Sequence, residues 1–239
     1  MRIICISDTH SLENNMRHAI PEGDVLIHAG DVSNRGGQRD VTAFINWFMD
    51  LKHDTKIFIS GNHDFCFERR YEPHHKGDYD WLEHLLSYEN LSQSNVEYLQ
   101  DEHFLIESPE FSRPIKFYGT PWQPWFYDWA FNLPRGEKLA EKWANIPEGL
   151  DILVTHGPAH GMVDHTIQGL NVGCKDLFER VMLAQPKIHV CGHIHWAYGQ
   201  KNFFGVEFLN ASTLNERYQY ENKPIVIEYN PETKEIDYV

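Results

Sequence analysis

The stretch 187-KIHVCGHIHWAYG-199 joins a short apolar run to a cluster of histidines. Alternate side chains of an extended strand point to the same face. Four side chains of this stretch would share such a face: His189, Cys191, His193 and His195. Alternate residues lie roughly 6.6–6.8 Å apart, whereas the ligands of one zinc-like ion all lie about 2.0–2.3 Å from it. Either these are ordinary strand residues, or the last two histidines serve two different ions.

Apolar runs of strand-like length recur along the whole chain. They are 2-RIICIS-7, 25-VLIHAG-30, 56-KIFISG-61, 115-IKFYG-119, 151-DILVTHG-157 and 188-IHVCG-192, followed by 203-FFGVEFLNAS-212 and 224-PIVIEY-229. Helix-like stretches lie between them at 38–52, 135–146 and 173–185. This alternation predicts an α/β protein with a partly parallel sheet, and the last two runs, which no helix separates, make the sheet system mixed. A length of 239 residues fits a single domain, 1–239.

Polar residues of metal-ligand type follow five of these runs. The residues are Asp8 and His10 after the first run, Asp31 after the second, Asn62, His63 and Asp64 after the third, and then His156, His193 and His195 after two later ones. In open α/β sheets, ligands gather at the carboxyl ends of the strands. Each residue alone is explained by a role in a turn or a helix cap. Such roles, however, do not explain why residues of this type follow five different strands. The pattern therefore favours a metal cluster.

Composition limits the class of partner. The formal net charge is -14, which argues against a long nucleic acid and against an anionic membrane surface. A small anionic substrate remains compatible, because bound cations invert the local field. The four cysteines are spread singly, no apolar run approaches the roughly 20 residues of a membrane span, and the N-terminus soon turns polar. We therefore expect a reduced, cytoplasmic protein.

The ordered motifs D-x-H, G-D, G-N-H-D, T-H-G and G-H-x-H, from Asp8 to His195, resemble the calcineurin-like metallophosphoesterase superfamily. Segments 119–136, 155–161 and 209–213 look like its metallophosphoesterase-domain branch in animals, which is similar to class III cyclic-nucleotide phosphodiesterases. The resemblance covers nearly the whole chain. It implies a four-layer α/β/β/α sandwich with two mixed β-sheets and a metal site at the C-terminal strand edge.

The resemblance also implies two divalent metal ions and a ligand set for each. The first ion would be held by Asp8, His10 and His195, the second by Asn62, His156 and His193, and Asp31 would bridge them. Some animal members have glycine in place of His193, which this chain keeps. Imidazole, carboxylate and amide donors suit Mn, Fe, Co, Ni or Zn, and we expect Mn²⁺ to be the best activator.

The implied reaction is phosphoester hydrolysis by in-line attack of a metal-bridging hydroxide, with phosphodiesters, including cyclic nucleotides, as expected substrates. His63 would protonate the leaving oxygen and Asp64 would orient it, although a turn-capping role for Asp64 stays open. Arg35 is either a phosphate contact or a solvated loop residue. The aromatic segment 117–131 is expected mostly to pack, although it could stack a nucleobase.

Two alternatives remain: a small-molecule phosphomonoesterase of the same fold, and a non-catalytic metal-binding scaffold protein. Scaffolds are expected to lose ligands or His63, and this chain keeps them. The expected partner is a small phosphoester substrate. No residue pattern indicates a homodimer, although symmetric dimers are common. His74 and His75 are expected in an exposed loop.

Overall fold

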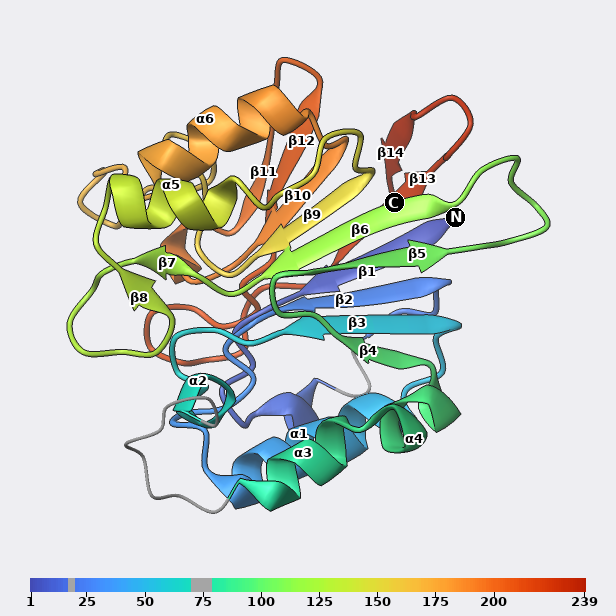
Figure 1. The fold of residues 1–239 in the computed structure, drawn as a ribbon, viewed down its shortest axis with the longest axis vertical. Coiled ribbons are helices and arrows are strands. Elements are labelled where there is room, and N and C mark those ends of the chain that lie inside the picture. Colours follow the sequence, from blue (N-terminus) through green and yellow to red (C-terminus); the bar gives the residue numbers. More distant parts are fainter. Residues whose placement is uncertain (17–19, 70–78) are drawn as a thin grey trace.

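Two six-stranded mixed sheets form the centre of the computed structural model, which describes residues 1–16, 20–69 and 79–239 (Figure 1). His74 and His75 lie outside the described residues. The first sheet has the order β14 (Ile236–Tyr238), β13 (Ile225–Tyr229), β1 (Arg2–Ile6), β2 (Val25–Ala29), β3 (Thr55–Ile59) and β4 (Val96–Tyr98). The second has the order β11 (Gly199–Phe203), β12 (Val206–Asn210), β10 (Ile188–Cys191), β9 (Ile152–Thr155), β6 (Ile115–Thr120) and β5 (Glu102–Ile106).

Each sheet has a parallel centre and antiparallel additions. In the first, β1, β2, β3 and β4 pair in parallel, while β13 and β14 are antiparallel. In the second, β12, β10, β9 and β6 are parallel, with antiparallel β11 and β5 at the edges. A short pair, β7 (Gln123–Pro124) with β8 (Asn132–Leu133), lies apart from both sheets. The prediction of two mixed sheets is confirmed.

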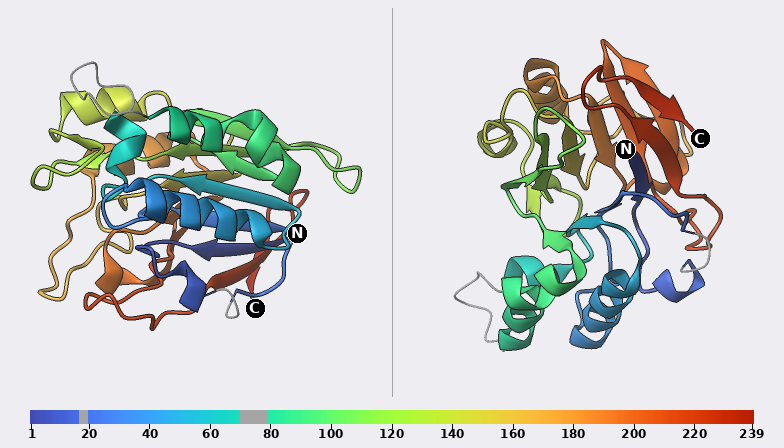
Figure 2. Two further views of the ribbon diagram at one scale, coloured as in Figure 1. Left: turned by 90° about the horizontal axis from the view of Figure 1, so that it is seen from below. Right: turned by 90° about the vertical axis from the view of Figure 1, so that its right-hand side faces the viewer.

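Helices cover the outer faces of the sheets (Figure 2). The helices are α1 (Gln38–Asp50), α2 (Phe65–Arg69), α3 (Asp80–Leu86) and α4 (Tyr88–Leu91) beside the first sheet, and α5 (Glu137–Trp143) and α6 (Lys175–Ala184) beside the second. Short 3₁₀ turns occupy Glu13–Asn15, Ser92–Ser94 and His195–Ala197. The four-layer α/β/β/α arrangement is therefore confirmed.

Strand alternation explains these layers. Ile3 and Cys5 of β1 point into the core between the two sheets, and Ile4 and Ile6 point to the helices on the outer face. The helix-like stretch predicted at 38–52 contains α1, whose apolar residues, including Phe44, are buried. Strands covered on both faces need apolar residues at every position, which accounts for continuous rather than alternating hydrophobic runs.

The carboxyl ends of the two sheets meet, which brings distant parts of the chain together. An isolated parallel bridge joins Ser7, just after β1, to Ser212, just after β12. All four cysteines are buried and free. Among the described residues, no helix has the length and apolar character needed to cross a membrane.

Candidate metal centre

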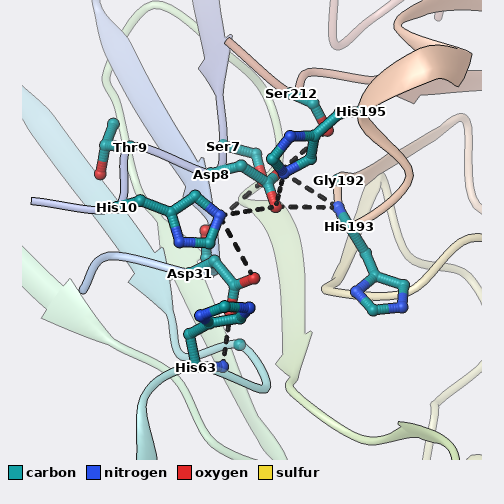
Figure 3. A network of polar contacts seen from close by, with 12 residues as sticks. Ser7, Asp8, Thr9, His10, Asp31, His63, Gly192, His193, His195 and Ser212 are labelled. Atoms are coloured by element: carbon teal, nitrogen blue, oxygen red, sulfur yellow. Dashed lines mark hydrogen bonds and ion pairs between the residues drawn. The ribbon is translucent and has the colours of Figure 1, made fainter. Parts of the chain in front are cut away.

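Asp8, His10 and His195 form the first group of ligand-type atoms, within 4.8 Å of one another. Asp8 Oδ1 lies 3.4 Å from His195 Nε2 and 4.0 Å from His10 Nε2. The Asp8 carboxylate accepts hydrogen bonds from Ser212 Oγ at 2.8 Å and from the His193 backbone N–H at 3.1 Å. Figure 3 shows this carboxylate between the two imidazoles. The structure thus brings together the three side chains predicted for the first ion.

Asp31, His156 and His193 form a second group with the same spacing. His156 Nε2 lies 3.3 Å from Asp31 Oδ2 and 3.0 Å from Asn62 Oδ1. The same Asp31 oxygen lies 3.7 Å from His10 Nε2 of the first group. Asp31 therefore lies between the two groups, where a bridging carboxylate was predicted.

Two of the histidines present a defined nitrogen to the carboxylates. His156 Nδ1 lies 2.9 Å from the Ala29 carbonyl oxygen, and His195 Nδ1 lies 3.0 Å from that of Asn215. Because a carbonyl only accepts, each Nδ1 carries the hydrogen. A neutral ring then has its lone pair on Nε2, which faces the carboxylates and can bind a metal ion.

The electrostatics of the two groups call for cations. Burial is the largest single effect on the His156 pKa and lowers it, but the charge and hydrogen bond of Asp31 together with the charge of Asp8 raise this pKa to about 9. Burial also lowers the His195 pKa, but the hydrogen bond and charge of Asp8 together with the Asn215 carbonyl raise it to about 9. Without metal ions, the two imidazoles would take up protons to balance the buried carboxylates. Divalent ions can fill the same need.

His10 gives a direct test of fit. Its side chain is 1% exposed, and neither ring nitrogen has a hydrogen-bond partner among the described residues. A buried polar atom without a partner is costly in an ordinary core. Burial lowers the His10 pKa to about 4, so the ring is neutral at pH 7 and has a lone pair to donate. The nitrogen and oxygen donors of the cluster therefore fit divalent transition ions.

At two glycines the backbone lies so close to a ligand-type carboxylate that there is no room for a side chain. A Cβ atom on Gly192 would lie 2.2 Å from Asp8 Oδ2, and one on Gly61 would lie 2.3 Å from Asp31 Oδ1. Both glycines immediately precede ligand-type residues. In addition, Asp8, Asp31 and His193 have positive φ angles of 56°, 55° and 68°. Such angles are uncommon outside glycine, although Asp and His adopt them more readily than most residues.

His63 lies beside the cluster with its ring held from two sides. Its Nδ1 lies 2.9 Å from the Asn34 carbonyl oxygen, and its ring stacks on Trp129 at a centroid distance of 4.2 Å. Its backbone N–H donates to Asp31 Oδ1 at 2.8 Å. His10, Asp31 and His63 also form a ligand-type group. The position of His63 fits either a metal ligand or a proton donor. Measurement of the metal content of a His63 variant distinguishes these two roles.

Among the described residues, the Asp64 side chain forms hydrogen bonds with loop donors rather than with His63. The Asp64 carboxylate accepts from the N–H groups of Val32, Ser33 and Gly61 and from Ser33 Oγ, at 2.7–3.1 Å. Burial, followed by the charge of Asp31, raises its pKa to about 6, so it is ionised at pH 7. Asp64 joins the loops after β2 and β3, because four donors converge on it before the chain enters α2. This is the capping alternative.

Arg35 is exposed. It lies beside Trp129, the residue whose ring stacks on His63. Its guanidinium carbon is 5.1 Å from the centre of the Trp129 ring. Its contact with a phosphate stays a prediction. Trp129 was not distinguished from its neighbours in the sequence, because an aromatic-rich segment gives no indication of which ring leaves the core.

Tyr218 and Ser212 are two further neighbours that the sequence did not single out. The Tyr218 ring lies 4.9 Å from the His10 ring and 5.5 Å from the His195 ring. Ser212 belongs to the 209–213 segment that carried part of the family resemblance, which was its only indication.

Comparison with known proteins agrees with this geometry. A family model described as calcineurin-like phosphoesterase matches residues 1–197. The human metallophosphoesterase domain-containing protein 1 is 41% identical over 237 residues, covering 95% of this chain and 70% of that protein. The Caenorhabditis elegans protein K07C11.7 is 33% identical, covering 95% and 74%.

Solved structures support the fold alone. The protein TT1561 of Thermus thermophilus matches with a TM-score of 0.61 at 11% identity, over 99% of this chain and 96% of that one. GAP50 of Plasmodium matches with a TM-score of 0.51 at 11% identity, over 95% and 80%. The family model and the relatives show that the chain belongs to the calcineurin-like phosphoesterase family, a family of phosphoester hydrolases that use divalent metals.

Proposed function

We propose that this protein is a dinuclear-metal phosphodiesterase that uses Mn²⁺. The observation that carries the proposal is the pair of ligand groups that share Asp31. Asp8, His10 and His195 would hold one ion, and Asn62, His156 and His193 would hold the other. Two such ions, when bound, neutralise phosphoryl charge and lower the pKa of water.

His63 is the proton donor in this proposal. Because its Nδ1–H is engaged by the Asn34 carbonyl, Nε2 is the atom that delivers a proton to the leaving oxygen. The ring is only half-buried, unlike the buried His10 and His156, so a substrate can approach it. Trp129 fixes the plane of the ring by stacking.

Diesters are favoured over monoesters because of this donor. A monoester dianion gains more from the positive charge of two ions. A diester anion, however, has no phosphate proton to pass to its leaving alkoxide, so a protein group must supply one, and a positioned acid typically contributes 10²–10⁴-fold. Cyclic nucleotides are phosphodiesters. The resemblance of the chain to class III cyclic-nucleotide phosphodiesterases makes them substrates worth testing.

The test compares kcat/KM for bis-p-nitrophenyl phosphate and p-nitrophenyl phosphate at the same Mn²⁺ concentration. We expect the diester to be the better substrate. A tenfold advantage of the monoester, about 1.4 kcal/mol of transition-state preference, would favour the phosphomonoesterase alternative. Absence of hydrolysis of either ester by metal-loaded, folded protein would favour the scaffold alternative.

The predicted cytoplasmic location and the small-molecule partner stay part of this proposal. The four free, buried thiols are consistent with a reducing compartment. Fractionation of cells that express the tagged protein tests the location.

A further inference from the structure

A mainly apolar pocket of about 340 Å³ opens beside the candidate metal centre. Its walls include Trp125, Phe126, Pro158, Val172 and Ile194, and His193 of the second ligand group lies at its edge. A cavity of about 150 Å³ already holds benzene, so this pocket has room for an aromatic ring. None of the reaction steps proposed above uses it.

The aromatic wall is exposed but held in place. Trp125 is 63% exposed and Phe126 is 55% exposed, which is unusual for two adjacent large apolar side chains in an otherwise ordered loop. Asn132 Nδ2 donates to the Phe126 carbonyl at 3.1 Å, and Trp125 N–H donates to the Leu133 carbonyl at 2.8 Å. The backbone is therefore fixed while the rings stay available to a ligand.

The opposite wall is also fixed. The Arg135 guanidinium donates to the carbonyl oxygens of Val172 and Gly173 at 2.7 and 2.8 Å. A Cβ atom on Gly173 would lie 2.7 Å from the Ala159 carbonyl group, so the loop packs tightly onto the segment after β9. Both walls are formed before any ligand binds, which limits the entropy cost of binding.

The pocket and the proton donor lie at different ends of the centre. His193 points away from Asp8 and His10, whereas His63 lies beside His10 and Asp31 (Figure 3). His193 lines the pocket, but neither His63 nor its neighbour Trp129 does. A leaving group that takes a proton from His63 therefore departs away from the pocket.

We propose that this pocket binds the ester group that stays on phosphorus, and that it selects phosphodiesters whose retained group is a flat aromatic ring. The proposal rests on the proposed function, since a monoester has no second organic group to place there. In the reaction, the oxygen of water adds to phosphorus and water releases one proton to solvent. The P–O bond to the leaving alcohol breaks, His63 supplies the proton to that oxygen, and solvent returns a proton to His63. The products are the free alcohol and an aryl phosphate whose ring still occupies the pocket.

The test keeps the leaving group constant. Manganese-loaded protein is assayed with phenyl p-nitrophenyl phosphate and methyl p-nitrophenyl phosphate, which both release p-nitrophenol. We expect kcat/KM to favour the phenyl ester by about tenfold or more, because only the phenyl ring fills the pocket. Trp125→Ala and Phe126→Ala should each lower this phenyl-to-methyl ratio by about fivefold. Tyr88→Ala, which removes an aromatic ring that is 79% exposed on α4, should leave the ratio unchanged.

A binding measurement distinguishes failure of the pocket assignment from failure of the phosphodiesterase proposal. Calorimetry with phenylphosphonate, a stand-in for the retained aryl phosphate, should give tighter binding and a more negative heat-capacity change than methylphosphonate. Trp125→Ala should remove most of the difference. Equal hydrolysis of both diesters would overturn the pocket assignment and leave the phosphodiesterase proposal intact. If no diester is hydrolysed, the phosphodiesterase proposal fails, and equal binding of the two phosphonates would overturn the pocket assignment as well.

Discussion

Replacement of Asp64 by asparagine tests whether this residue joins two loops or orients His63. The Oδ2 atom of Asp64 accepts from the N–H groups of Val32 and Gly61. Its Oδ1 atom accepts from the N–H group and the hydroxyl of Ser33. Asparagine has one oxygen and one NH₂ group. In either orientation of the amide, the NH₂ group therefore faces N–H groups of the loops, which are also donors.

The magnitude follows from that mismatch. With the amide oxygen at the Oδ2 position, the Ser33 N–H faces the NH₂ group and loses its acceptor, which costs about 1–3 kcal/mol for a buried donor. The remaining hydrogen bonds are no longer made to a charged group and weaken by about 1 kcal/mol in total. Asp64→Asn should therefore lower the free energy of unfolding by about 2–4 kcal/mol. The reverse orientation leaves two donors unpaired and costs more.

Urea unfolding followed by circular dichroism measures this change, with Asp54→Asn as a matched control on an exposed aspartate. The control should change stability by no more than about 0.5 kcal/mol. For Asp64→Asn we also expect weaker metal binding, because the loops that it joins carry Asp31 and Asn62. Unchanged stability together with a hundredfold loss of kcat would refute the capping role and restore the orienting one.

Three further changes test other parts of the site and the fold. His63→Ala should keep its metal content and lose roughly 10²-fold or more in kcat, whereas loss of one ion equivalent would make His63 a ligand. Trp129→Ala should lower kcat/KM by up to about tenfold, since an aromatic pair contributes about 0.5–1.5 kcal/mol, and Trp129→Phe should retain most of the activity; equal losses in both would argue against stacking. Arg113 forms two hydrogen bonds of 2.8 Å to the buried Asp151, so Asp151→Asn should destabilise the protein by about 3–5 kcal/mol. Burial is the largest single effect on the Asp151 pKa and raises it, but the hydrogen bonds from Arg113, Tyr229 and the Lys116 N–H together hold this pKa below its usual range. The stabilisation should therefore be present above about pH 4 and be lost below it. Equal acid sensitivity of wild type and variant would contradict this.

The strand-end pattern was sufficient to predict which ligand-type residues lie close together. Parallel strands end at one edge, so residues such as Asp8, Asp31 and His156 had to approach one another once their strands were correctly placed. Two histidines separated by one residue could not bind one ion, and the structure places His193 and His195 in different ligand groups.

Sheet order and side-chain partners could not be predicted in the same way. β13 pairs with β1 across more than 200 residues, and no local pattern encodes that pairing. The partners of Asp64 could not be predicted, because adjacency to His63 in sequence does not determine which donors reach a carboxylate. Trp129 and Trp125 lie in the same aromatic-rich segment, and the sequence does not distinguish their roles. In the structure Trp129 stacks on His63, whereas Trp125 forms part of a pocket wall.

Metal stoichiometry tests the central claim most directly. Protein loaded with Mn²⁺, freed of excess metal by gel filtration and measured by elemental analysis, should contain about two ions per chain, as expected for a dinuclear site. Asp31→Ala should lower the content of both ions, because its carboxylate lies between the two ligand groups. Folded wild-type protein that binds one ion or none, or an Asp31→Ala variant that still binds two, would contradict the dinuclear account.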